Sequence, residues 1–231
     1  MKNNFQGFPK ELFLFFEALS QNNTKDWFSE NKPKYEQFVV APMLEFIEQI
    51  GPRLNGISPY FEAIPKKSGG SMFRIYRDVR FAKDKTPYKE HAACQFRHEA
   101  GKDAHAPGFY VHLAPETIKV GGGIWLPPSD KLLMIRQRIV DKPKEWSAVI
   151  EDEGIKRYFG GVAGESLKRP PRGFKEDSSH IIDLKRKSFF LMREFPATAA
   201  CHETFIDEVA ETFETATPLM AFLCAAAGVS Y

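Results

Sequence analysis

The first quarter of the chain has apolar residues at the spacing of an α-helix. From Pro9 to Leu19, and again from Tyr35 to Leu54, apolar side chains recur every three or four residues. Between these segments the run 22–24 (Asn, Asn, Thr) consists of residue types that cap helix starts, so a further helix is expected to begin there. Pro33 is expected to interrupt that helix.

The middle of the chain changes to the two-residue period of β-strands. From Met72 to Phe81 apolar and charged side chains alternate, which predicts a strand. Arg77 is the exception, because it falls on the apolar face and would be a charge that needs a partner. Further strands are expected over His91–Arg97 and Phe109–Leu113, with a hairpin leading into Thr117–Val120.

Helical spacing returns after this region. A helix is expected from Asp130 to about Val140, and Pro143 suits the first turn of another. Residues 158–174 are rich in glycine, proline and charge and are expected to form hairpin and loop, followed by a strand at Ser188–Arg193. A last amphipathic helix carries Phe205, Val209 and Phe213 toward Pro218.

These elements predict an α+β fold. A mainly antiparallel sheet is expected to be covered by N-terminal and C-terminal helices. We expect a single domain over residues 1–231, with a helical part over about 8–57, a β-rich centre over about 70–125 and a mixed helical part over about 129–228.

Composition limits the kinds of partner. The 231 residues include 32 lysines and arginines against 30 acidic residues, so a net charge of +2 gives no overall attraction to nucleic acid or an anionic membrane. Three widely spaced cysteines argue against a disulfide framework and favour a cytoplasmic location. Residues 1–8 do not read as a secretion signal, and the apolar stretch from Pro218 to Val229 is too short to cross a membrane.

The segment 72–91 is unusually basic. It carries six cations and three acids, a local charge of +3. On a strand, Arg74 and Arg80 would flank Asp78 on one face and could present two guanidinium groups to a carboxylate or phosphate. The expected ligand-binding residues here are Arg74, Arg77, Asp78, Arg80, Lys83, Asp84, Lys85 and Lys89.

The same segment carries a resemblance. The run R-I-Y-R-D-V-R-F-A-K-D-K-T-P-Y-K, with N-N-T-K-D-W-F before it and G-G-G-I-W, Pro127 and Arg136 after it, resembles the domain-of-unknown-function family 2461. The likeness extends from Phe8 to the segment that begins at Pro218, and Ala82 stands where the family's run has a serine. The resemblance implies a compact intracellular protein and no particular activity, and it makes the motif the first location to search for a shared site.

Three interpretations of the motif stay open. The first is a pocket for a small anionic ligand, in which Tyr88 or His91 would transfer protons and Trp125 and Arg136 would add a wall and a donor. The second is an interaction module that docks an acidic protein or a nucleic-acid backbone on an exposed basic patch. The third is a purely structural lattice, in which Asp78 and the other acids pair with the arginines.

Other chemistry is weakly indicated. His91, His98, His105 and His112 are seven residues apart, a spacing that fits no tight ligand pattern, so we expect no metal site, and no cofactor is indicated. Residues 121–123 are three glycines without the lysine and hydroxyl of a phosphate-binding loop, and a turn or bulge is the favoured interpretation. The basic loop 168–172 lacks aromatic stacking partners and is a weak signal for nucleic acid.

Overall fold

The chain folds around one curved antiparallel sheet. The computed structural model describes residues 5–101 and 107–231. Within these residues, each strand pairs with the next along the chain, so the sheet is a simple meander in the order β1 to β5. The strands are β1 (Phe61–Glu62), β2 (Ala92–His98), β3 (Gly108–Leu113), β4 (Ile118–Ile124) and β5 (Phe189–Phe195). The predicted α+β class with an antiparallel sheet is confirmed.

The N-terminal helices follow the apolar pattern. They are α1 (Lys10–Gln21), α2 (Lys25–Tyr35), the π-helical turn η1 (Glu36–Val40) and α3 (Ala41–Ile57). The Thr24 hydroxyl caps α2 by accepting a hydrogen bond from the Trp27 backbone N–H. The predicted interruption at Pro33 is wrong, because Pro33 lies inside α2 and the chain continues through the wider turn of η1 into α3.

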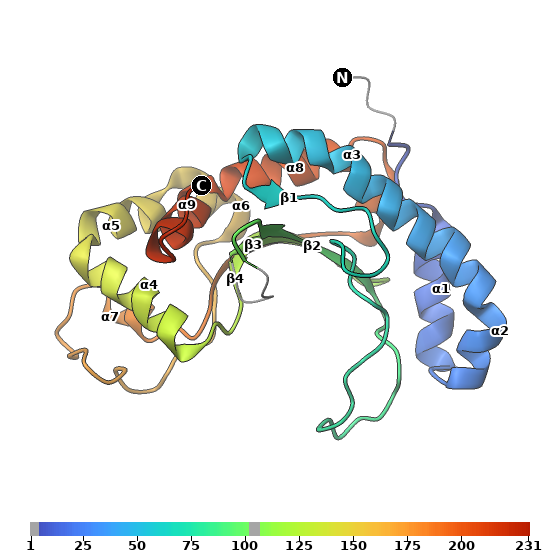
Figure 1. Ribbon diagram of the computed structural model, residues 1–231, viewed down its shortest axis with the longest axis horizontal. Coiled ribbons are helices and arrows are strands. Elements are labelled where there is room, and N and C mark those ends of the chain that lie inside the picture. The colour runs from blue at the N-terminus through green and yellow to red at the C-terminus, as the bar shows by residue number, and fades with distance from the viewer. Residues whose placement is uncertain (1–4, 102–106) are drawn as a thin grey trace.

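One face of the sheet is buried under helices. Along β2 and β3 the side chains of Cys94, Phe96, Phe109 and Val111 alternate onto this face, and all four are fully buried. Helices α8 (Phe205–Thr215) and α9 (Thr217–Ala226) lie against β4, and α3 lies against β1 and β2. Figure 1 shows α3 and α8 running above the arch of the sheet. This layer is the hydrophobic core.

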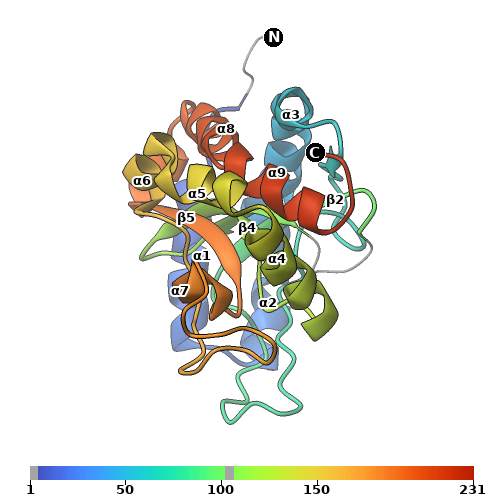
Figure 2. The same ribbon diagram turned by 90° about the vertical axis from the view of Figure 1, so that its left-hand side faces the viewer.

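The opposite, concave face is flanked by helices at its ends. Figure 1 shows the α1–α2 pair at one end of the arch and the helices between β4 and β5 at the other, and Figure 2 views the molecule from that second end. These helices are α4 (Ser129–Asp141), α5 (Pro143–Glu151), α6 (Glu153–Phe159) and α7 (Ile181–Leu184). Side chains on the concave face, such as Tyr110 and His112, are only half-buried. We call this surface the open face.

Residues 72–91 form a long loop, which we call the basic excursion. The predicted strand from Met72 to Phe81 is wrong, since only isolated bridges form, between Met72 and Cys94 and between Tyr76 and Tyr88. The alternating pattern is used at the base, where Ile75 is buried, but the tip leaves the sheet and Phe81 is 94% exposed. Figure 1 shows this loop projecting below the arch.

The three glycines at 121–123 belong to β4. The predicted turn or bulge is wrong, because Gly121, Gly122 and Gly123 pair in register with Met192, Leu191 and Phe190 of β5. A Cβ on Gly121 would lie 1.9 Å from the Leu191 carbonyl oxygen, so glycine is required by the close approach of β5 and not by a turn. Among the described residues, no helix is both long enough and apolar enough to cross a membrane.

Candidate functional site

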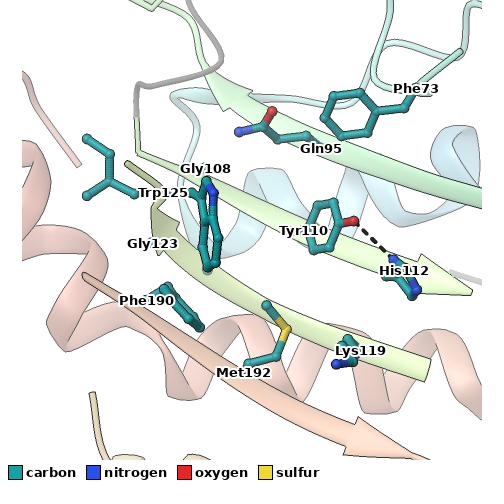
Figure 3. A pocket seen from close by; sticks show the side chains of 12 residues that line it. Phe73, Gln95, Gly108, Tyr110, His112, Lys119, Gly123, Trp125, Phe190 and Met192 are labelled. Atoms are coloured by element: carbon teal, nitrogen blue, oxygen red, sulfur yellow. Dashed lines mark hydrogen bonds between the residues drawn. The ribbon is translucent and has the colours of Figure 1, made fainter. Parts of the chain in front are cut away.

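A cavity of about 590 Å³ lies on the open face over β3, β4 and β5. Figure 3 shows its lining, which combines apolar and polar side chains. The larger apolar members are Phe73, Trp125, Phe190 and Met192, and the polar members are Gln95, Tyr110, His112 and Lys119. A concave site with a mostly apolar lining and a few polar groups is the usual form of a small-molecule pocket.

Strand register places these groups. Tyr110 and His112 are two residues apart on β3, so both side chains rise from the open face. Lys119 pairs with His112 across β3 and β4, which puts its side chain beside the imidazole. The Lys119 ammonium also forms an ion pair of 3.2 Å with Glu194 of β5.

Two histidines and a tyrosine form a cluster at one side of the cavity. The Tyr110 hydroxyl and His112 Nδ1 are 3.2 Å apart, a hydrogen bond shown in Figure 3. The His91 ring stacks on His112 with 4.2 Å between ring centroids. Burial lowers the pKa of both histidines from 6.5 to about 4, helped by the neighbouring His112 and Lys89 at His91 and by Lys119 at His112. Both imidazoles are therefore neutral at pH 7.

A smaller hollow of about 180 Å³ adjoins the cavity and shares Phe73 and Tyr110 with it. Its lining adds Arg74, Lys89 and His91, so the base of the basic excursion reaches the open face. Burial, and then the charge of Arg74, lowers the pKa of Lys89. Among the described residues that line either hollow, none is an aspartate or glutamate.

The tip of the basic excursion is tied together by ion pairs. Arg80 pairs with Asp78 at 2.7 Å, and Arg77 pairs with Asp84 at 2.5 Å. The hydrogen bonds from Arg80 lower the pKa of Asp78 to about 2, and a backbone hydrogen bond from Thr86, followed by that from Arg77, does the same for Asp84.

The remaining cations of the tip also lie away from the hollows. Lys85 donates to the Val79 carbonyl at 2.9 Å, and Lys83 is exposed. Of the motif residues expected to bind a ligand, the structure therefore brings Arg74 and Lys89 to the hollows. The other expected ligand-binding residues lie toward the tip of the excursion, namely Arg77, Asp78, Arg80, Lys83, Asp84 and Lys85.

Tyr88 anchors the excursion to the core. Its ring is buried and stacks on Phe28 at 4.2 Å, and burial raises its pKa. The Asn23 side chain accepts from the Tyr88 N–H at 3.1 Å and donates to the Tyr88 carbonyl at 3.0 Å. Tyr88 does not line either hollow, whereas His91 does. Asn23 was expected only as a helix-cap residue, although its place in the N-N-T run linked it to the motif.

The two residues expected downstream have different positions. Trp125 lines the cavity, with its ring 5.1 Å from that of Phe190. Arg136 is buried elsewhere and donates to the Leu184 carbonyl at 2.7 Å and the Arg186 carbonyl at 3.0 Å, so it joins α4 to the end of α7 and the segment that follows. Arg136 does not reach the cavity that Trp125 lines.

The evenly spaced histidines do not gather. His98 is buried on the core face, where its Nε2 lies 2.7 Å from the Ser230 carbonyl, while His91 and His112 face the open side. His105 lies outside the described residues. In the part of the chain that the structure describes, no group of three or more histidine, cysteine, aspartate or glutamate side chains could hold a metal ion.

Most of the cavity lining was missed from the sequence. Gln95, Tyr110 and Lys119 were present in the expected strands but were not singled out, and His112 was considered only as one of the evenly spaced histidines. The sequence feature that could have identified these residues is the alternation along β2, β3 and β4. On these strands polar and aromatic residues occupy positions between the buried ones.

The chain matches one protein family along most of its length. The model of the family described as conserved hypothetical protein (DUF2461) matches residues 11–222. This range includes the basic excursion and every residue named above as lining the cavity. No curated protein and no solved structure matches the chain.

Proposed function

The chain belongs to the DUF2461 family of conserved hypothetical proteins, and we propose that its open face binds a small anionic ligand. The observation that carries this proposal is the hollow beside Arg74 and Lys89. Two cations meet there at the edge of a larger cavity, with no carboxylate among the described lining residues. An anion bound there would interact with both charges at once.

The state of the two cations supports this ligand class. Lys89 is half-buried and directs its ammonium to the Arg74 carbonyl at 2.9 Å, 5.3 Å from the Phe73 ring centroid. Among the described ion pairs none includes Arg74 or Lys89, in contrast to Arg77 and Arg80. Removing an ammonium from water beside a second cation costs free energy, and a bound anion would offset that cost.

Charge removal at the hollow tests the proposal. Inorganic phosphate, methyl phosphate and acetate are titrated into the wild type and an Arg74→Gln/Lys89→Gln variant while the unfolding midpoint is recorded. A ligand that binds only the folded state raises this midpoint. We expect stabilisation of the wild type to be lost in the variant and retained in the matched control Arg80→Gln/Lys83→Gln. Equal responses in both variants, or none in the wild type, would contradict an anion site at the hollow.

A catalytic role would fall to His91 rather than Tyr88. His91 lines the hollow beside the cations and is neutral at pH 7, so it can accept a proton from a bound ligand. Tyr88 is buried against Phe28. We therefore propose His91 as the group for any proton transfer in this site.

A second candidate function belongs to the tip of the basic excursion. Phe81 is 94% exposed, and Arg80, whose guanidinium lies 5.9 Å from the Phe81 ring centroid, is largely exposed beside it. An exposed aromatic among cations favours docking of an acidic protein segment or a nucleic-acid backbone. Binding of poly-glutamate and of a short single-stranded oligonucleotide should then be weakened by Phe81→Ser and unaffected by Arg74→Gln.

The compartment proposed for this binding is the cytosol. Cys94, Cys201 and Cys224 are all free, as expected of a protein that functions under reducing conditions.

A further inference from the structure

The floor of the cavity carries few side chains. On the open face Gly108 pairs with Gly123, and Tyr110 pairs with Gly121. The β4 backbone therefore carries no side chain over two successive open-face pairs, and β3 carries none at Gly108. A Cβ on Gly123, whose φ is +148°, would lie 2.3 Å from the Phe189 carbonyl oxygen. The close approach of β5 thus excludes a side chain here and keeps the floor flat.

Apolar side chains surround this bare floor. The rings of Trp125 and Phe190 are 5.1 Å apart, and Met192 and Phe73 continue the wall around the cavity. Figure 3 shows the Trp125 indole and the Tyr110 ring standing over the sheet on either side of the open floor. Trp125 is 57% exposed, so a large aromatic surface faces the cavity and the solvent. Covering such a surface with an apolar ring is favourable.

The backbone fixes Trp125 at the cavity rim. The next residue, Leu126, has φ +40°, a left-handed conformation that is uncommon for a bulky residue. Its N–H donates to the hydroxyl of the buried Ser188 at 2.8 Å, which holds this conformation. Backbone strain of this kind concentrates at ligand sites, where the surrounding structure maintains it.

From these features we propose that the ligand is an aromatic anion. A flat aryl or heteroaryl ring lies on the glycine floor against Trp125 and Phe190, and its carboxylate or phosphate group reaches Arg74 and Lys89 in the adjoining hollow. One molecule can span both spaces because Phe73 and Tyr110 line both. This inference rests on the proposed anion site and adds the chemical class of the ligand.

A matched series of phosphate monoesters tests the ring separately from the charge. Phenyl, cyclohexyl and methyl phosphate are titrated by calorimetry into the wild type and into Trp125→Ala. We expect phenyl phosphate to bind at least tenfold more tightly than methyl phosphate and several-fold more tightly than cyclohexyl phosphate. Trp125→Ala should remove most of this advantage without changing the affinity for methyl phosphate. For the carboxylates, we expect benzoate to bind more tightly than acetate in the wild type and to lose most of that advantage in Trp125→Ala.

The control and the contrary outcomes keep the two proposals distinct. Ile182→Ala, at an exposed apolar residue that does not line the cavity, should leave all affinities unchanged. Arg74-dependent binding of methyl phosphate, with no gain from the phenyl ring or an equal loss in Ile182→Ala, would overturn the aromatic ligand and leave the anion site standing. Failure of every monoester and carboxylate to bind the wild type would overturn both.

Discussion

Burial sets the protonation of the histidine pair and makes folding stability depend on pH. His91 and His112 have pKa values of about 4 in the folded chain, below the ordinary 6.5, so the unfolded chain binds more protons between these values. The contribution of this pair to the free energy of unfolding is complete above pH 6.5 and falls as the pH drops toward 4. Because both rings are partly exposed, we expect a loss on the order of 1–3 kcal/mol in all, measured by urea unfolding.

The control compares removal of the buried histidine pair with removal of an exposed histidine. A His91→Gln/His112→Gln variant should lose much of the decline between pH 6.5 and 4, whereas the exposed His202→Gln should keep it. A profile that is identical in the wild type and the double variant would show that burial of this pair does not govern the acid response.

Asp183 holds a buried polar cluster at the other end of the molecule. Its carboxylate accepts from Trp146 Nε1 at 2.9 Å and pairs with Arg186 at 2.8 Å. Replacing it with alanine leaves a buried indole N–H and a largely buried guanidinium without their acceptor. We expect Asp183→Ala to lower the free energy of unfolding by about 3 kcal/mol, measured by chemical denaturation. The exposed Asp130→Ala is the control, and equal effects would argue against this role.

The position of a single residue was predictable from the sequence where neighbouring residues in the chain determine it. Trp125, which one of the three interpretations of the motif made a pocket wall, lines the cavity because it directly follows a strand of the open face. Arg136 was expected beside it, but the donors of Arg136 are satisfied by carbonyls about 50 residues further along the chain. Such a partner depends on how α4 packs, which residue spacing does not reveal.

At the scale of elements, the basic excursion is held by its base. The Asn23 side chain bonds both backbone groups of Tyr88, and the Lys89 N–H donates to the Ile75 carbonyl at 2.8 Å. We expect Asn23→Ala to weaken this attachment by about 1–2 kcal/mol and to increase trypsin cleavage within the excursion. Asn22→Ala, which removes only an exposed bond to the Ala18 carbonyl, is the matched control and should leave cleavage unchanged.

Pairing of β4 with β5 depends on glycine. A Cβ on Gly121 would collide with the Leu191 carbonyl oxygen at 1.9 Å, and neither backbone can withdraw without breaking the ladder. We expect Gly121→Ala to lower the free energy of unfolding by about 3 kcal/mol or more, measured by chemical denaturation. In contrast, Gly56→Ala, in α3 with no atom within 4 Å of the added carbon, should be neutral or stabilise by about 0.5–1 kcal/mol. Similar effects at both sites would contradict this explanation.

Elements were predictable where periodicity continued over a whole segment. The expected strands at His91–Arg97, Phe109–Leu113 and Ser188–Arg193 and the helix after Pro143 are present as β2, β3, β5 and α5. The strand expected at Met72–Phe81 fails because its charges pair with acids in the same loop, which stabilises a conformation without a partner strand. Glycines 121–123 were assigned to a turn or bulge because the β5 backbone that requires them is distant in sequence.

For the whole molecule, one-sided coverage of the sheet explains why a site can exist on it. Helices α3, α8 and α9 bury the core face, so this face of the sheet belongs to the hydrophobic core that stabilises the fold. The open face is free to carry Tyr110, His112 and Lys119, which would be costly in a core. The alternating pattern of β3 and β4 therefore reflects both the core and the candidate site, although only the core positions were predicted from it.

The single domain expected from the sequence stays a prediction, and two buried thiols can test it. Cys94 lies in β2 and Cys224 in α9, both fully buried, and burial raises the pKa of each thiol. In a Cys201→Ser variant, both should react with a thiol reagent only through global unfolding, because one hydrophobic cluster includes both. Equal labelling rates with equal urea dependence would support one cooperative unit, whereas faster labelling of Cys224 at low urea would show that α9 opens independently.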